Sequence, residues 1–124
     1  MKISKNISLK KIQNNFRDIY PGLKLEFYRN AHVHFEGSLK NNILNSDIIL
    51  GEVNQNLIAG NISFEPNKTV QKLENEFKTN FGLNAQVHRR SNDLWLQTIN
   101  TDDWTLEQQN QRGIDSVTEP SIIL

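Results

Sequence analysis

The sequence predicts an α+β fold made of two pseudo-equivalent halves, each with the order strand, helix, strand, strand and short helix. The first observation is an internal repeat, in which the pattern of residues 8–27 recurs at 69–87. The second is that each copy has one segment with helical spacing, followed by two segments with alternating apolar residues. A repeated unit buries its apolar face against its neighbour. We therefore expect one compact domain over residues 1–124, with repeats at about 1–56 and 60–113 and a short C-terminal tail.

Each copy is expected to begin with a short strand and a long helix. Apolar residues alternate over residues 1–4 and 62–64, as in half-buried strands. Ser8 and Thr69 then precede apolar residues at helical spacing, and their side-chain oxygens are suited to cap the first turn. The residues expected on the buried faces of the two helices are Leu9, Ile12, Phe16, Ile19, Tyr20, Val70, Leu73, Phe77 and Phe81.

Glycine and aspartate mark the expected ends of helices. We expect Gly22, Gly82 and Gly113 to end helices, because glycine best tolerates the left-handed conformation that closes a helix. Asp47 and Asp103 each stand three residues before a leucine and are expected to open a short helical turn. An aspartate at this position caps the turn and interacts favourably with the helix dipole.

Two alternating segments follow each long helix. Leu23, Leu25 and Phe27 in the first copy correspond to Leu83, Ala85 and Val87 in the second. The next strand of each copy is expected to turn Val33 and Phe35, or Leu94 and Leu96, inward, which leaves His34 and Trp95 on the opposite face. These strands would form a mostly antiparallel sheet with the two long helices on one face. A ferredoxin-like sheet fits such a duplicated unit.

A second architecture is suggested by resemblance. The residues Thr69-Val70-x-x-Leu73, Gly82-Leu83, Thr105-Leu106 and Ile122-Ile123-Leu124 resemble the second half of ubiquitin-like β-grasp domains. The layout is also similar to short bacterial proteins that carry Phe77-x-x-x-Phe81-Gly82-Leu83 followed by Asp103-x-x-Leu106. The resemblance implies a β-grasp-like helix on a sheet. It does not imply conjugation, because the terminus lacks the Gly-Gly of ubiquitin-type modifiers.

Composition narrows the classes of function. Lysine and arginine number 14 against 14 aspartates and glutamates, so no basic face for nucleic acid is expected. The absence of cysteine excludes disulfides and thiolate chemistry. No apolar stretch approaches the roughly 20 residues of a membrane helix, and the start lacks the apolar region of a secretory signal. We therefore expect a cytoplasmic protein with no membrane segment and, without a phosphate-binding glycine loop, no cofactor.

The first functional hypothesis is a non-catalytic protein-interaction or adaptor module. His34 and Trp95 occupy corresponding positions on strands that we expect at sheet edges, where unpaired backbone groups can recruit another strand. Arg89 and Arg90 lie at the end of a strand and suit an acidic partner. A protein partner or a second copy of the chain is expected to dock there, and no residue is assigned a catalytic role.

The alternative hypothesis is a small metal-binding protein or enzyme. His32 and His34 are separated by one residue, so both project from the same face of a strand and can chelate zinc or copper. His88 would supply a third ligand if its strand lies nearby. Adjacent Asp102 and Asp103 are better explained by helix capping than by acid–base chemistry.

Overall fold

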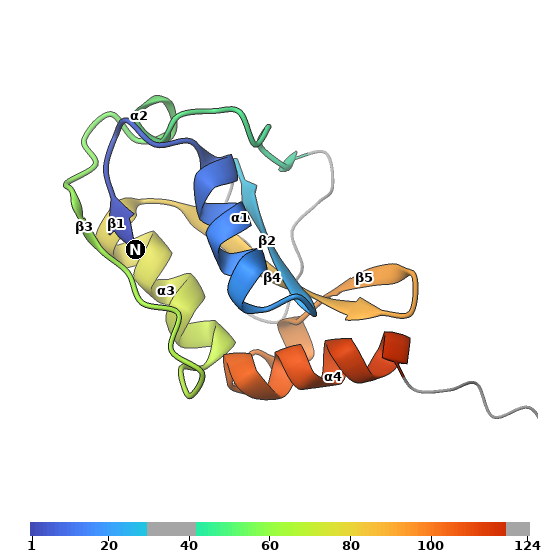
Figure 1. The fold of residues 1–124 in the computed structure, drawn as a ribbon. Helices are drawn as coiled ribbons and strands as arrows, with labels where there is room; N and C mark the ends of the chain where they lie inside the picture. Colours follow the sequence, from blue (N-terminus) through green and yellow to red (C-terminus); the bar gives the residue numbers. More distant parts are fainter. Residues whose placement is uncertain (30–41, 119–124) are drawn as a thin grey trace, which may run out of the picture.

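The computed structural model describes residues 1–29 and 42–118 as an α+β protein with helices and two antiparallel sheets (Figure 1). The elements in chain order are β1 (Lys2–Ile3), α1 (Leu9–Ile19), β2 (Leu23–Tyr28), α2 (Leu50–Val53), β3 (Gly60–Asn61), α3 (Val70–Phe81), β4 (Asn84–Ser91), β5 (Leu94–Gln97), a 3₁₀ turn (Ile99–Thr101) and α4 (Leu106–Thr118). None of the helices in these ranges is long and apolar enough to span a bilayer.

The two sheets are joined by the long helices. The larger sheet has the strand order β2-β4-β5, so its central strand β4 pairs on both sides. The smaller sheet pairs β1 with β3. Next to that pair, the amino group of Met1 donates to the Ile62 carbonyl at 2.7 Å, and the Ile62 N–H donates back at 2.9 Å. The N-terminus is therefore fixed to the middle of the chain.

The two long helices begin in the same way. The Ser8 side chain accepts from the Lys11 N–H, and the Thr69 side chain accepts from the Lys72 N–H, both at 3.2 Å. These bonds satisfy donors that a helix N-terminus leaves unpaired, and they confirm the caps predicted at Ser8 and Thr69. The cap predicted at Asp47 is wrong, because the N-cap of α2 is Ile49, without a side-chain hydrogen bond. α3 ends as predicted at Gly82, whose φ of +64° is left-handed.

The core lies between the long helices and one face of the larger sheet. Phe16 of α1 and Phe77 of α3 are fully buried, as their spacing predicts. Phe27 of β2 packs edge-on against Phe77, with ring centroids 5.4 Å apart. Phe64 contacts both helices through the same two phenylalanines, at 5.2 Å from Phe16 and 6.4 Å from Phe77. One aromatic cluster therefore holds both helices on the sheet.

The sequence predicted that Gly22 and Gly113 end helices, but neither glycine does. α1 ends earlier, with Tyr20 as its C-cap, and α4 continues through Gly113 to Thr118. The two glycines instead meet where α4 crosses the start of β2. A Cβ added at Gly22 would lie 2.5 Å from the Asn110 carbonyl oxygen, and one at Gly113 would collide with the Gly22 carbonyl. Glycine is needed there for close approach rather than for a left-handed turn.

Three strand predictions also need correction. The strand expected at residues 62–64 is replaced by β3, which lies just before it. Arg89 and Arg90, which were expected at the end of a strand, lie within β4, because β4 continues to Ser91. Leu94 and Leu96 lie on the helix-bearing face as the alternation predicts, but they are 63% and 42% exposed. β5 lies at the edge of the sheet, beyond the area that the long helices cover.

Candidate functional site

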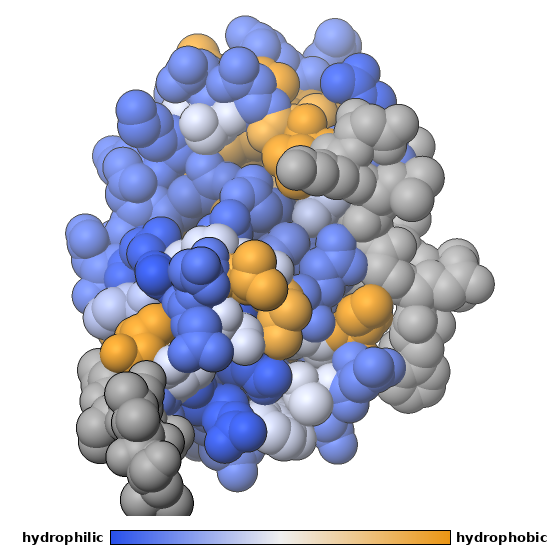
Figure 2. All heavy atoms as spheres, turned by 90° about the vertical axis from the view of Figure 1, so that its right-hand side faces the viewer, coloured by the Kyte–Doolittle hydropathy of each residue, from blue (hydrophilic) through white to orange (hydrophobic). Residues whose placement is uncertain are grey.

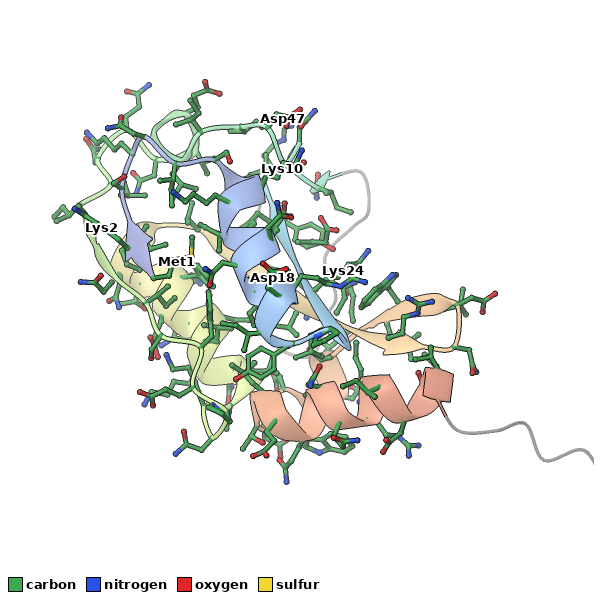
Figure 3. The ribbon with its side chains drawn as sticks, in the orientation of Figure 1. Met1, Lys2, Lys10, Asp18, Lys24 and Asp47 are labelled. Carbon is green, nitrogen blue, oxygen red and sulfur yellow. The ribbon has the colours of Figure 1, made fainter. Side chains whose placement is uncertain are left out.

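The clearest candidate site is Trp95 of β5 with three cations around its ring. The Arg17 guanidinium lies 4.6 Å from the ring centroid, the Lys24 ammonium 4.9 Å and the Arg90 guanidinium 5.5 Å. We call these four residues the Trp95 cluster. They come from α1, β2, β4 and β5, and Figure 3 shows Lys24 on the side of β2 toward β5.

The register of the larger sheet explains how these residues meet. Arg90 pairs directly with Trp95, and Lys24 pairs with His88, two residues from Arg90 on the same face. The half-buried indole therefore extends over β4 toward β2. The three positive charges are each attracted to the aromatic ring, but they repel one another. Their arrangement favours an anion.

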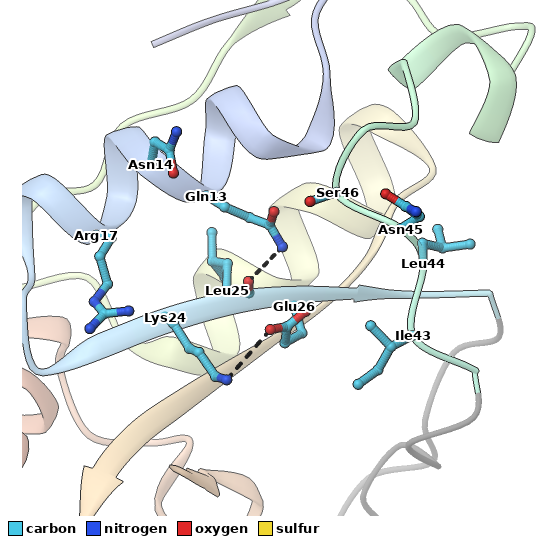
Figure 4. Close-up of a pocket in the computed structure, with 10 residues that line it drawn as sticks. All are labelled: Gln13, Asn14, Arg17, Lys24, Leu25, Glu26, Ile43, Leu44, Asn45 and Ser46. Carbon is cyan, nitrogen blue, oxygen red and sulfur yellow. Dashed lines mark hydrogen bonds and ion pairs between the residues drawn. The ribbon is translucent and has the colours of Figure 1, made fainter. Parts of the chain in front are cut away.

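A groove along the outer edge of β2 leads to the Trp95 cluster (Figure 4). Its volume is about 470 Å³, within the range of ligand sites. Its walls are α1, β2 and residues 43–46, and the lining residues are Gln13, Asn14, Arg17, Lys24, Leu25, Glu26, Ile43, Leu44, Asn45 and Ser46. We call this feature the β2-edge groove. Arg17 and Lys24 belong to both the groove and the cluster, so the two surfaces are continuous.

The backbone edge of β2 lies along this groove. Among the described residues, backbone hydrogen bonds on its outer side lie near both ends of the strand: Leu23 N–H donates to Tyr20 O at 2.9 Å, Leu44 N–H donates to Phe27 O, and Arg29 N–H donates to Asn42 O. Nearer the cluster, Gln13 Nε2 donates to the Leu25 carbonyl at 2.9 Å. This bond uses one backbone acceptor, so only the middle of the strand edge, around Leu25, borders the groove without a backbone partner among the described residues.

The surface around the hairpin is mainly polar. Figure 2 views the molecule from that end and shows, in its lower half, hydrophilic residues with small separate apolar spots. Leu94 and Val117 are exposed. Large exposed apolar patches mark hydrophobic interfaces. The lower half of this view shows mainly polar surface instead.

A buried polar cluster lies beside Trp95 on the same sheet face. Tyr28 and His88 stack with ring planes 8° apart, and Tyr28 Oη lies 3.0 Å from His88 Nε2. Burial, with a smaller effect of the Lys24 charge, lowers the pKa of His88 to about 4. Burial, with a smaller effect of Glu26, raises the pKa of Tyr28 to about 12. Both side chains are therefore neutral near pH 7, which suits their desolvation.

The structure brings together only part of the predicted partner-binding set. Trp95 and Arg90 share one sheet face, whereas Arg89 points to the other face and lies 5.5 Å from the Trp104 ring. His34 lies outside the described residues. The alternation of side chains along this strand correctly predicted that Trp95 and Leu94 lie on opposite faces of the sheet.

The histidine hypothesis involves residues that the structure does not describe. His32 and His34 lie outside the described ranges, so the metal-binding alternative with His88 stays a prediction. Within residues 1–29 and 42–118, no three histidine, aspartate or glutamate side chains are grouped to hold a metal ion. His88 Nε2 faces Tyr28, which leaves Nδ1 as its other nitrogen.

Sequence reasoning missed Arg17 and Lys24. Their positions relative to Trp95 depend on the order β2-β4-β5, which joins residues that are far apart in the chain. Side-chain alternation could have identified Lys24. This residue stands between the inward-facing Leu23 and Leu25, so its side chain is expected on the opposite face of the sheet, the face that was also expected for Trp95.

No family model matches the chain, and neither the curated proteins nor the solved structures gave a match. The geometry defines the class of the molecule: an α+β protein with a strand-edge groove that ends at a cation-surrounded tryptophan.

Proposed function

We propose that this protein is a non-catalytic interaction module that binds an acidic, extended segment of a partner protein. The segment would add to the edge of β2 in the β2-edge groove, with one acidic side chain at the Trp95 cluster. The observation that carries the proposal is the ring of Arg17, Lys24 and Arg90 around Trp95, 4.6 to 5.5 Å from its centroid.

The charge balance of the cluster supports an anionic partner. Within the described residues, Arg17 and Arg90 form no ion pair, and Lys24 has only a 3.6 Å contact with Glu26. Exposed ion pairs at such a distance contribute little. A carboxylate from a partner would reduce the repulsion among the three cations and form charge-assisted hydrogen bonds with them.

The strand edge supports an extended partner. Peptides that add to a sheet edge gain affinity from main-chain hydrogen bonds and specificity from alternate side chains. The β2-edge groove offers both a backbone edge and polar walls that can contact such side chains. β5, one of the two strands that we predicted as docking sites, also lies at an edge, but the groove follows β2 instead.

Single-stranded nucleic acid is the competing occupant. Such sites combine a basic groove with several aromatic side chains on which successive bases stack. The Trp95 cluster offers one indole, and the chain has no net positive charge. These features favour the acidic peptide, and the oligonucleotide becomes one arm of the test.

The test is a titration followed by NMR, with a peptide of alternating glutamate and valine as probe. We expect shifts at the β2 amides and the Trp95 indole N–H. Arg17→Gln and Lys24→Gln should each weaken binding about tenfold, the usual effect of one close charge pair. Lys10→Gln, an exposed α1 lysine outside the groove, is the matched control. Equal binding of a lysine–valine peptide, or tighter binding of an oligothymidine, would refute the proposal.

We also propose that residues 1–124 form one domain of two tandem halves, at about 1–56 and 60–113. Matching bonds support this: Leu9 N–H donates to Ile48 O at 2.9 Å, and Val70 N–H donates to Trp104 O at 3.0 Å. The order β2-β4-β5 with a separate β1–β3 pair lends no support to a β-grasp-like or ferredoxin-like topology. A cytoplasmic location stays part of the proposal.

A further inference from the structure

A second hollow lies on the other side of the β4–β5 hairpin, between its turn and α4. Its volume is about 260 Å³, and it is lined by Arg89, Arg90, Ser91, Asn92, Arg112, Asp115 and Ser116. We call it the arginine hollow. Drug-sized ligands usually occupy roughly 300–1,000 Å³, so a space of this size suits a small ligand.

The base of the arginine hollow is held by hydrogen bonds between the turn and the helix. Ser116 Oγ donates to backbone carbonyls on both sides, Arg90 O at 3.1 Å and Gly113 O at 2.7 Å, and these are alternative acceptors for one hydroxyl hydrogen. It also accepts from the Asn92 N–H at 3.1 Å. Asn92 has a left-handed φ of +55°, which asparagine tolerates well. The lining residues are therefore positioned by the backbone rather than by their own flexible side chains.

Among the described residues, no arginine of this hollow forms an ion pair with a carboxylate. Arg89 Nη1 donates to Gln109 Oε1, a neutral acceptor, at 2.9 Å. Asp115 Oδ1 accepts from Gln111, and among the described residues Asp115 forms no ion pair with an arginine. Burial, and then the charge of Arg112, lowers the pKa of Arg89. The hollow therefore has a positive potential that an anion would stabilise.

The charges of the lining identify the class of anion. Three arginines and one aspartate line the arginine hollow, a formal net charge of +2 in which the charge of Arg90 is shared with the Trp95 cluster. A phosphate monoester carries about −1.5 to −2 at pH 7 and presents three acceptor oxygens. Arginine forks bind such oxygens in pairs. A carboxylate, with a single negative charge, would leave one positive charge unmatched.

We propose that the arginine hollow binds a phosphate monoester, carried either by a phosphorylated side chain or by a free metabolite. Arg89 and Arg112, which the test uses, belong to neither the β2-edge groove nor the Trp95 cluster, whereas Arg90 is shared with the cluster. The proposed site adds a phosphate-recognition function to a chain whose net charge gives no hint of one.

The test is an NMR titration of the arginine side-chain N–H signals with inorganic phosphate. We expect saturable shifts for Arg89 and Arg112 with a dissociation constant on the order of 1 mM, as suits a few solvent-accessible charged bonds. Arg112→Gln and Arg89→Gln should each weaken binding about tenfold. Affinity should also fall below about pH 6, where the ligand becomes a monoanion. Phosphoserine and glycerol 3-phosphate as further probes distinguish the two sources by their relative affinity.

Two controls separate a site from general electrostatics. Lys78→Gln removes one positive charge from an exposed position on α3 and should leave the affinity unchanged. Thermal melting tests whether Arg112→Gln is folded. We expect it to be folded because Arg112 is exposed. Shifts that increase linearly without saturation, or an equal loss in Lys78→Gln, would overturn the proposal.

Discussion

The edge of β2 that faces away from β4 borders a groove, whereas the edge of β4 that faces away from β2 is covered by other parts of the fold. The helices before the two strands nevertheless begin alike. Gln13 of α1 and Glu74 of α3 stand at corresponding places after their caps, and each reaches the edge of the strand beneath it. Gln13 donates to Leu25 O at the wall of an open groove. Glu74 is buried and accepts from the Val87 N–H at 2.9 Å. A capped helix followed by a strand therefore occurs in both halves, but the strand edge is covered in the second half and borders a groove in the first.

The closing of the β4 edge involves more than Glu74. β5 pairs with β4 from His88 onward, and Thr98 Oγ1 donates to the Val87 carbonyl at 2.9 Å. Both backbone groups of Val87 that face this edge therefore have partners inside the fold. On β2, the residue that corresponds to Val87 is Phe27, whose carbonyl accepts from the Leu44 N–H at 2.7 Å, and the groove borders the strand nearer Leu25. The two halves thus differ in what lies beside this edge: β5 in the second half and the groove in the first.

The largest expected effect tests whether the two halves share one core. Phe16→Ala and Phe77→Ala each remove a fully buried ring from the aromatic cluster. Each should lower the free energy of unfolding by about 3–5 kcal/mol, as usual for a packed phenylalanine. Urea denaturation of both variants measures the two losses. A loss below about 1 kcal/mol at either position, typical of surface residues, would break the comparison.

The next effect concerns Tyr28 and His88, which stand at corresponding positions and stack on each other. Because the pKa of folded His88 is lowered from 6.5 to about 4, the unfolded chain binds more protons between these values. Stability is therefore highest above pH 6.5 and is lost as the pH falls toward 4. The full loss is on the order of 3 kcal/mol.

The control for this pH effect is His88→Gln. Lys24, Glu26 and Glu74 also lie near the Tyr28–His88 pair, and their charges are unchanged by the substitution. Unfolding by urea at several pH values should give a shallower dependence for the variant between pH 6.5 and 4. Parallel curves for both proteins would show that His88 is not the titrating group.

The third prediction compares the two strand edges directly. Glu74→Ala leaves the buried Val87 N–H without its acceptor, which costs about 1–3 kcal/mol. Gln13→Ala should cost less than about 0.5 kcal/mol, because water in the groove can bond to Leu25 O. Hydrogen exchange at the Val87 amide should quicken in the first variant alone. Equal losses of stability would show that the groove edge is as closed as the β4 edge.

The sequence predicted local features better than contacts between distant segments. Ser8, Thr69 and Gly82 were identified correctly, because a cap depends on residues within one turn. The roles of Gly22 and Gly113 could not be found in the same way. Their conformation is ordinary, and the need for glycine arises only where α4 crosses β2.

The candidate site shows the same limit. Alternation placed Trp95 on the face away from Leu94 and Leu96, and this was sufficient to select it. Its partners Arg17 and Lys24 come from the other half of the chain, so their convergence depends on the strand order. His88 is buried because of tertiary packing, whereas the sequence pattern of its strand allowed exposure as readily.

The last prediction concerns Trp95, where a small effect on stability separates a binding residue from a core residue. The indole is half-buried, and its contacts are with three cations rather than with the aromatic cluster. A cation–π contact at an exposed site contributes only about 0.5–1 kcal/mol, and removing the ring also lets the three cations move apart. Trp95→Ala should therefore lower the free energy of unfolding by less than about 1 kcal/mol.

The same variant should lose binding of the glutamate–valine peptide, because the acidic side chain no longer has an ordered set of cations beside an aromatic face. Trp95→Phe is the matched control, since it keeps an aromatic ring for Arg17 and Arg90 to flank and should retain most of the affinity. Thermal melting and the NMR titration are measured on the same samples. If Trp95→Ala instead melts far below the wild type, the indole belongs to the core, and the contrast between an open first edge and a closed second edge loses its functional meaning.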